Sequence, residues 1–289
     1  MVRGALVRPR ASPFLAAVRG PSIRAILARM IEIDGYSLES VELVGETRAF
    51  YRRGSGRAVV VLSEIPGITP EMIRFANRLV DAGFTVYVPQ LFGEPMRPMS
   101  PGYAARSIAR VCIRREIHVL AADGSSPMIV WLRELAKLAH AECGGPGVGV
   151  VGMCITGNFG LAMMLDAPVT ASVLSQPSLP VGPTAAQRAA LHVTPTELAA
   201  VREKVERGAR VLGLRFTGDP LCPPARFERL RRELGAGFEG IEIPSEHANP
   251  RAPKPAHSVL THHLIDAEGE PTRAALDRTV TFLRERLGA

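Results

Sequence analysis

Short apolar strands alternate with amphipathic helices along nearly the whole of this chain, and few architectures accommodate such a pattern. Ala58 to Leu62 is a β-branched run of the kind found in buried parallel strands. Thr69 then provides a helix N-cap followed by Pro70, and the predicted helix ends at Gly83. This alternation predicts an α/β fold in which a mostly parallel sheet carries helices on both faces.

The other predicted elements continue the same pattern to the end of the chain. Strands or a hairpin are predicted over 41–51, single strands over 84–88, 147–151, 171–175, 211–217 and 238–243, and helices over 13–33, 104–120, 126–141, 157–165, 194–207, 224–234 and 272–287. No linker-like stretch divides the chain. We therefore expect one α/β domain over residues 36–289, preceded by an N-terminal extension with a helix over residues 1–35.

The composition excludes several classes of protein. The chain has 289 residues, of which 46% are hydrophobic and 22% charged, so it can bury a sizeable core. Its longest apolar runs are much shorter than the roughly 20 residues that cross a bilayer. The four cysteines lie far apart, which leaves no C-x-x-C pair for zinc or redox chemistry. We expect a protein of the reducing cytoplasm, with no metal or organic cofactor.

The positive charge is concentrated at the N-terminus. The formal net charge is +7, and residues 1–31 contain six arginines and no acidic residue. Such a segment can contact a membrane surface, a nucleic acid or an acidic partner, or serve as a transit peptide. The simpler interpretation is a solvated leader followed by a helix packed on the domain. Aromatic residues make up only 5% of the chain, so we expect no nucleic-acid binding.

A strand, a glycine-rich break and a helix meet at residues 148–160. Gly152 precedes Cys154 by two positions, as in a Gly-x-nucleophile turn at the carboxyl edge of a sheet. A helix N-terminus there favours an anion and acidifies a nearby thiol. Thr156 stands where a second glycine is expected, and Gly157 comes one place late. The alternative is a buried apolar cysteine. The glycine spacing fits neither a dinucleotide fingerprint nor a Walker A loop.

A cysteine nucleophile needs a base and an acid that orients the base. Asp219 follows a predicted buried strand and a glycine, which places it at the same sheet edge as Cys154. Alternatively, Asp219 simply starts a turn with Pro220. The histidine candidates are His247, His257 and the adjacent pair His262 and His263, and their positions in the chain favour none of them strongly.

Together, these segments resemble the dienelactone hydrolase family of α/β-hydrolases. The resemblance covers roughly residues 45–287. It rests on residues 59–67 (VVVLSEIPG), 86–93 (VYVPQLFG), the Gly152–Cys154 turn, the Gly218–Asp219 turn, and His257-Ser258 followed by 278–282 (RTVTF). The spacing between the last two motifs is that of the family, which favours His257 over His247.

The resemblance also implies roles for the loop after the first parallel strand. In the family, a glutamate at the position of Glu64 touches the resting cysteine and helps to activate it. Backbone N–H groups corresponding to Ile65 and Ile155 form the oxyanion hole, in agreement with the predicted geometry. Thr156 departs from the family pattern, and so does Gln90, where the family usually has aspartate. Arg97 and Arg106 are weak candidates for the family's carboxylate-binding arginine.

The expected function is hydrolysis of a carboxylic ester or lactone through Cys154, His257 and Asp219. In this mechanism Glu64 tunes the thiol, and the Ile65 and Ile155 N–H groups hold the oxyanion. The expected partner is a small-molecule substrate, and the protein is expected to be a monomer or a small homo-oligomer. The alternative is a catalytically silent α/β-hydrolase scaffold that binds a small ligand or a partner protein.

Overall fold

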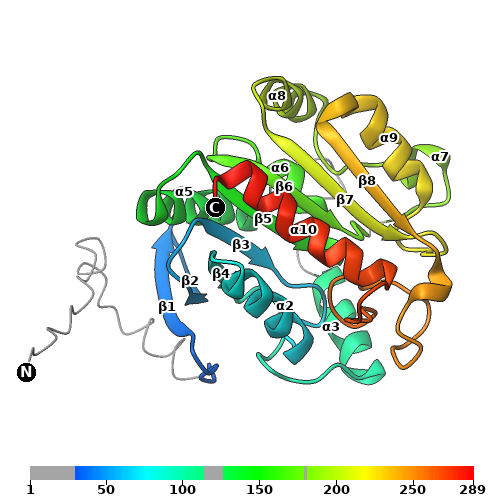
Figure 1. Ribbon diagram of the computed structural model, residues 1–289, viewed down its shortest axis with the longest axis horizontal. Helices are drawn as coiled ribbons and strands as arrows, with labels where there is room; N and C mark the ends of the chain where they lie inside the picture. Colours follow the sequence, from blue (N-terminus) through cyan, green and yellow to red (C-terminus); the bar gives the residue numbers. More distant parts are fainter. Residues whose placement is uncertain (1–29, 114–125, 179–180) are drawn as a thin grey trace, which may run out of the picture.

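A twisted eight-stranded sheet forms the centre of the computed structural model, which describes residues 30–113, 126–178 and 181–289 (Figure 1). The strand order is β1-β2-β4-β3-β5-β6-β7-β8. The strands are β1 (Ser37–Leu43), β2 (Glu46–Arg53), β3 (Ala58–Leu62), β4 (Thr85–Pro89), β5 (Val148–Met153), β6 (Val169–Ser175), β7 (Arg210–Phe216) and β8 (Phe238–Ile243). β1 and β2 form an antiparallel hairpin that pairs antiparallel with β4, and all other pairings are parallel. The predicted mostly parallel sheet is confirmed.

Helices cover both faces of the sheet, as predicted. The helices are α2 (Pro70–Asp81), α3 (Pro101–Ile113), α5 (Pro127–Cys143), α6 (Phe159–Met163), α7 (Ala185–Arg188), α8 (Pro195–Glu206), α9 (Pro224–Leu234) and α10 (Pro271–Leu287). α2 and α10 lie side by side on one face (Figure 1). α5, α6, α8 and α9 pack on the other.

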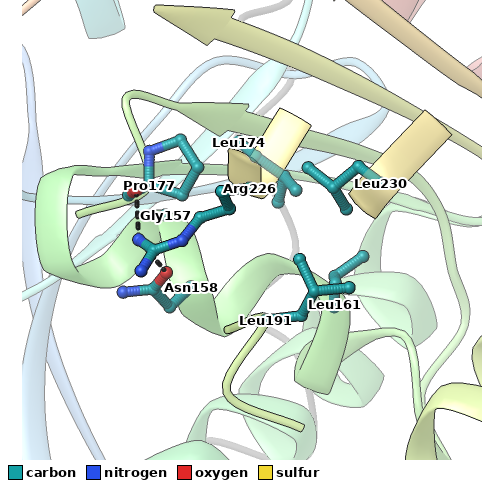
Figure 2. A pocket seen from close by; sticks show the side chains of 8 residues that line it. All are labelled: Gly157, Asn158, Leu161, Leu174, Pro177, Leu191, Arg226 and Leu230. Atoms are coloured by element: carbon teal, nitrogen blue, oxygen red, sulfur yellow. Dashed lines mark hydrogen bonds between the residues drawn. The ribbon is translucent and has the colours of Figure 1, made fainter. Parts of the chain in front are cut away.

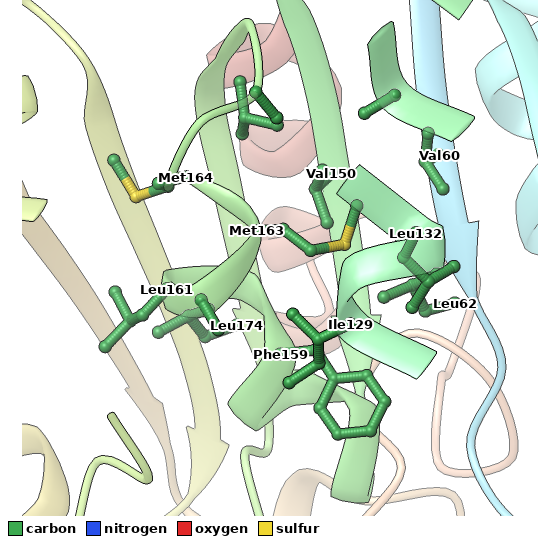
Figure 3. Close-up of a cluster of buried hydrophobic side chains, with 14 of the residues drawn as sticks. Val60, Leu62, Ile129, Leu132, Val150, Phe159, Leu161, Met163, Met164 and Leu174 are labelled. Carbon is green, nitrogen blue, oxygen red and sulfur yellow. The ribbon is translucent and has the colours of Figure 1, made fainter. Parts of the chain in front are cut away.

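The central strands are buried on both sides, and their alternation divides the core into two clusters. Val60 and Leu62 of β3 and Val150 of β5 face α5 and α6. There they belong to the same buried cluster as Ile129 of α5 and Phe159 of α6 (Figure 3). Val59 and Val61 point to the opposite face, toward α2 and α10. Burial on both faces explains why these strands are continuous apolar runs rather than alternating ones.

Local capping explains why several helices begin where they do. The hydroxyl groups of Thr69, Ser126 and Thr194 each accept a hydrogen bond from a backbone N–H of the first helical turn. A proline follows each cap at the first helical position, where its missing N–H costs nothing. α2, α5 and α8 therefore begin at the residues that their caps dictate.

Some predicted boundaries differ from the structure. The helix predicted over 157–165 is a 3-10 turn, Cys154–Asn158, followed by the short helix α6. α3 ends at Ile113, and the rest of its predicted range lies outside the described residues. Most of the helix predicted over 13–33 is also outside them, and residues 30–33 are not helical. α7 was not predicted.

The residues just before the predicted domain boundary at 35/36 pack against the sheet. Ile33 is buried in the core cluster on the α2 and α10 face. The Tyr51 hydroxyl donates a hydrogen bond to the Ile31 carbonyl (2.8 Å). In the part of the chain that the structure describes, no helix is long and apolar enough to cross a membrane.

Candidate active site

Cys154 lies on a sharp turn where β5 ends. Its φ is +59°, a left-handed conformation that is uncommon for a residue other than glycine and is typical of a nucleophile elbow. It is the first residue of the 3-10 turn, and only 7% of its surface is exposed. Gly152 leaves no room for a side chain, because a Cβ there would lie 2.2 Å from the Thr156 carbonyl oxygen. The turn therefore requires glycine at this position.

Thr156, the departure from the family pattern, stabilises the turn from behind. Its fully buried hydroxyl accepts a hydrogen bond from the Met153 N–H (2.9 Å) and lies 3.1 Å from the Leu62 carbonyl oxygen. This hydroxyl links the carboxyl ends of β3 and β5 and leaves the helix start in place. The glycine that the close packing requires is Gly157, where a Cβ would lie 2.9 Å from the Pro177 Cα.

Asp219 and His257 meet at the same edge of the sheet. Asp219 follows β7, and its side chain is completely buried. The His257 Nδ1–H donates to Asp219 Oδ2 at 2.6 Å, while Asp219 Oδ1 accepts from the Leu221 N–H (2.9 Å). Within the described residues, the buried His257 Nε2 has no hydrogen-bond partner. That nitrogen is therefore available to exchange a proton with a neighbouring group.

The environment of His257 favours its charged form. Burial by itself would lower the His257 pKa, but the nearby Cys154 sulfur and the hydrogen bond to Asp219 outweigh it. The net pKa lies well above the usual value for histidine. An imidazolium beside a cysteine is the arrangement that produces a reactive thiolate.

The other histidine candidates are occupied elsewhere. His263 Nδ1 accepts from the Ser258 N–H (3.1 Å), and its Nε2–H donates to the Pro253 carbonyl (2.8 Å). His262 lies near Glu71 of α2, and His247 belongs to a surface 3-10 turn. Of the four candidates, His257 is the one bonded to Asp219.

Glu64 has different contacts from those that the family resemblance implied. Its buried carboxylate accepts hydrogen bonds from the hydroxyls of Ser258 (2.6 Å) and Thr261, and from the Gln176 amide (3.4 Å). Among the described residues, these three side chains are the hydrogen-bond partners of the carboxylate, and the Cys154 thiol is not one of them. Glu64 instead holds the segment that carries His257.

The hydrogen bond to the cysteine comes from Ser178. Its hydroxyl donates to Cys154 Sγ at 3.0 Å, and its backbone N–H donates to the Cys154 carbonyl at 3.0 Å. Ser178 is fully buried and lies just past the end of β6, the neighbour of β5 in the sheet. We did not predict a role for Ser178. The only sequence signal was a polar residue just past the end of a predicted buried strand.

The predicted oxyanion donors lie at equivalent positions just past the ends of two adjacent strands. Leu62 of β3 pairs with Gly152 of β5, and Ile65 and Ile155 each follow three residues later. Ile155 is near the start of the 3-10 turn, where an N–H has no partner within the helix. The Ile65 N–H likewise donates to no protein acceptor among the described residues.

A buried arginine supports the nucleophile turn from α9. The Arg226 guanidinium donates to the Pro177 carbonyl (2.6 Å) and lies 3.4 Å from Asn158 Oδ1 (Figure 2). The Asn158 amide in turn donates to the Ser178 carbonyl (2.6 Å). Arg226 therefore joins the 154–158 turn to the 176–178 segment beside it. Neither Arg226 nor Asn158 was predicted from the sequence.

The two arginine candidates for a substrate carboxylate remain at the surface. Arg97 pairs with Glu94 and stacks 4.2 Å from the centre of the Tyr103 ring, and Arg106 is exposed on α3. The Gln90 amide donates to the carbonyls of Phe92 and Gly93, both at 2.8 Å, and so shapes its own loop. Within residues 30–113, 126–178 and 181–289, no group of three His, Cys, Asp or Glu residues could hold a metal ion.

Comparison with known proteins is consistent with this architecture. Residues 46–199, just over half of the chain, match the model of the dienelactone hydrolase family. A putative dienelactone hydrolase from Klebsiella pneumoniae is 20% identical, with a TM-score of 0.58 over 86% of this chain and 98% of that one. A dienelactone hydrolase from Anabaena variabilis is 14% identical, with a TM-score of 0.53 over 87% and 98%.

A third similar structure is described as an esterase. This cold-adapted esterase from an Arctic intertidal metagenomic library is 16% identical, with a TM-score of 0.54 over 88% of this chain and 97% of that one. At these identities the likeness concerns the fold. No curated protein is similar enough in sequence to count as a match.

Proposed function

Because this chain belongs to the dienelactone hydrolase family of α/β-hydrolases, we propose that it hydrolyses a carboxylic ester or lactone through Cys154, His257 and Asp219. The observation that carries the proposal is the 2.6 Å hydrogen bond between His257 and Asp219, with the His257 Nε2 buried and unbonded among the described residues. Cys154 lies close enough to influence the His257 pKa. These are the relations that an acyl-transfer site requires.

In the proposed reaction, the Cys154 thiol gives its proton to His257 Nε2, and the thiolate attacks the carbonyl carbon. The oxyanion that forms is held by the Ile65 and Ile155 N–H groups, and each such donor contributes about 3 kcal/mol to the barrier reduction. His257 then protonates the leaving alkoxide, which leaves a thioester on Cys154. His257 next removes a proton from water, and the resulting hydroxide attacks the thioester carbonyl. The carbon–sulfur bond breaks, the acid is released, and the departing Cys154 sulfur takes back the proton from His257.

Asp219 acts on His257 throughout this cycle. Its carboxylate fixes the tautomer in which Nδ1 carries a proton, so that Nε2 faces the reacting groups. Its negative charge stabilises the imidazolium that forms at each proton transfer. The complete burial of the Asp219 side chain strengthens this interaction, because no water screens it.

The test is steady-state hydrolysis of a short activated aryl ester by wild-type protein and by Cys154→Ala. We expect the variant to lose essentially all turnover while its thermal unfolding stays cooperative. Cys143→Ala is the matched control, because Cys143 lies at the end of α5, away from the turn. Full activity in Cys154→Ala would overturn the mechanism. No hydrolysis by the wild-type protein would favour the alternative, an α/β-hydrolase scaffold that binds a ligand without turnover.

A further inference from the structure

Two side chains lie near the Cys154 sulfur: the His257 imidazole, which can carry a charge, and the Ser178 hydroxyl, which stays neutral. Ser178 Oγ donates to Cys154 Sγ at 3.0 Å. The same sulfur is near enough to His257 to raise the pKa of that histidine. The Ser178 hydroxyl is fully buried, so no water competes for it. A buried hydroxyl hydrogen-bonds more strongly to a sulfur anion than to a neutral thiol, which is a weak acceptor.

We propose that Ser178 is a further catalytic residue, whose hydroxyl keeps Cys154 as a thiolate before substrate arrives. This inference rests on the proposed function. The thiol proton moves to His257 Nε2, and the Ser178 hydroxyl keeps its own proton and donates a hydrogen bond to the sulfur anion. The result is a standing thiolate–imidazolium pair, with charge balanced between Cys154 and His257.

The position of Glu64 supports a thiolate that is formed without substrate. In the activation implied by the family resemblance, the glutamate at this position touches the thiol. Here the Glu64 carboxylate accepts from Ser258, Thr261 and Gln176 and is not a partner of the sulfur. Titratable and charged groups also surround the partners of the thiol. His257 is bonded to Asp219 and interacts with His263, while Cys222 and Arg226 interact with Asp219.

The Ser178 hydroxyl is held in place by backbone contacts that a side-chain change leaves intact. The Ser178 N–H donates to the Cys154 carbonyl at 3.0 Å, and its carbonyl accepts from the Asn158 amide at 2.6 Å. Neither bond involves the hydroxyl. Replacement of Ser178 by alanine therefore removes one donor to sulfur and preserves the scaffold around it.

A donor to a thiolate has a signature in the dependence of reactivity on pH. A hydrogen-bond donor to the sulfur raises the fraction of thiolate at low pH. The same donor lowers the nucleophilicity of that thiolate, since nucleophilicity falls with basicity. Without the donor, the reaction should be slower at low pH and at least as fast at high pH, where every thiol is ionised. A purely structural defect would change the rate in the same direction across the whole range.

The experiment measures the rate at which iodoacetamide alkylates Cys154 from about pH 5 to 10, followed on the Cys154 peptide by mass spectrometry. The variants are Ser178→Ala, Ser178→Thr, which keeps a hydroxyl, and Ser172→Ala as the matched control. Ser172 lies on β6, is fully buried, and its hydroxyl has no hydrogen-bond partner among the described residues. Cooperative thermal unfolding is checked for each, and Ser178→Gly replaces Ser178→Ala if the latter does not fold.

In Ser178→Ala we expect the rate at pH 6 to fall about tenfold, the factor that corresponds to one hydrogen bond to a charged atom. At pH 10 the rate should equal or exceed that of the wild type. Ser178→Thr and Ser172→Ala should follow the wild-type profile. An unchanged profile in Ser178→Ala would overturn the proposal, and so would an equal loss in Ser178→Thr, because the effect would then come from shape.

Alkylation does not require turnover, so this test is separate from that of the proposed function. If no ester is hydrolysed but the alkylation profile depends on the Ser178 hydroxyl, the proposed function fails and the role of Ser178 in holding the thiolate stands. If Cys154→Ala abolishes hydrolysis but Ser178→Ala leaves the alkylation profile unchanged, the hydrolase proposal stands and the role of Ser178 fails.

Discussion

Two buried side chains of opposite charge support the candidate active site. Glu64 holds the segment that carries His257, and Arg226 holds the turn that carries Cys154. Glu64 accepts from the side chains of Ser258 and Thr261, which follow His257 in the chain. Arg226 donates to the backbone carbonyl of Pro177 and lies against Asn158 of the nucleophile turn. Each one joins a segment near the site to a distant part of the sequence.

The difference between them lies in what they bind. Arg226 bonds to main chain in the middle of the sheet's carboxyl edge, so its loss would leave a backbone carbonyl buried and unsatisfied. Glu64 bonds to hydroxyl groups that can rotate toward another partner. Arg226 is therefore expected to matter mainly for folding, and Glu64 mainly for the placement of His257.

The largest effect on stability is expected from Arg226→Leu. It removes a buried guanidinium and its bond to Pro177, and should lower the free energy of unfolding by about 3 kcal/mol. Urea denaturation measures this value. Arg232→Leu is the control, because Arg232 is exposed on the same helix and should change stability by less than about 0.5 kcal/mol. Equal effects in the two variants would show that Arg226 does not hold the turn.

Glu64→Gln should affect activity more than stability. The amide keeps the shape of the carboxylate and one acceptor oxygen, so the free energy of unfolding should fall by only about 1 kcal/mol. A less firmly held His257 should lower kcat roughly ten- to a hundredfold. Denaturation and ester hydrolysis are measured side by side, with Glu203→Gln on the exposed face of α8 as the control. A loss of stability as large as that of Arg226→Leu would remove the distinction between the two side chains.

The smallest expected effect is a pH dependence that arises from His263. Burial lowers the His263 pKa, and the neighbouring His257 and His262 lower it further, against the opposing effects of the Pro253 carbonyl and Glu64. As the pH falls through about 6.5, the unfolded chain binds a proton that the folded chain resists. His263 therefore contributes a loss of stability on acidification, opposite in sign to the contribution of His257, whose pKa is raised.

The His263 contribution to the free energy of unfolding should change by about 1 kcal/mol, because protonation of Nδ1 removes the acceptor of the Ser258 N–H. Denaturant unfolding at about pH 7.5 and about pH 5.5, in the wild type and in a His263 variant, measures this contribution. His263→Asn cannot titrate but can accept that bond, so between these two pH values its stability should fall less, or rise more, than that of the wild type. His247→Asn should change with pH as the wild type does. The same pH dependence in His263→Asn and in the wild type would show that His263 makes no such contribution.

Several features of the fold followed from local sequence because local physics determines them. Thr69-Pro70 and Thr194-Pro195 cap their helices as predicted, since a side-chain oxygen three residues before a free N–H acts within one turn. The β3 and β5 strands were recognised because burial on both faces demands unbroken apolar runs. The position of Cys154 on its turn followed from Gly152, which the close approach of Thr156 requires.

Other features depended on contacts between residues far apart in the chain. The sequence showed only that Thr156 stands where a glycine is expected. In the structure its hydroxyl bonds to the end of β3, more than ninety positions away. Glu64 was assigned to the thiol, yet its partners Ser258 and Thr261 lie nearly two hundred residues later. Spacing along the chain carries no information about which of several polar residues fill the same buried space.

Local sequence was enough to predict the order of the main strands and helices and a common sheet edge for Cys154 and Asp219, and the family resemblance added His257. The alternation of burial and the turn residues are properties of short segments, and parallel strands bring their carboxyl ends to one edge. The hydrogen bond from Ser178 to the sulfur and the contacts of Glu64 with the histidine segment became visible only in the folded structure. Hydrogen bonds in a buried cluster go to the nearest partner in space, and the packing of distant strands and loops sets that distance.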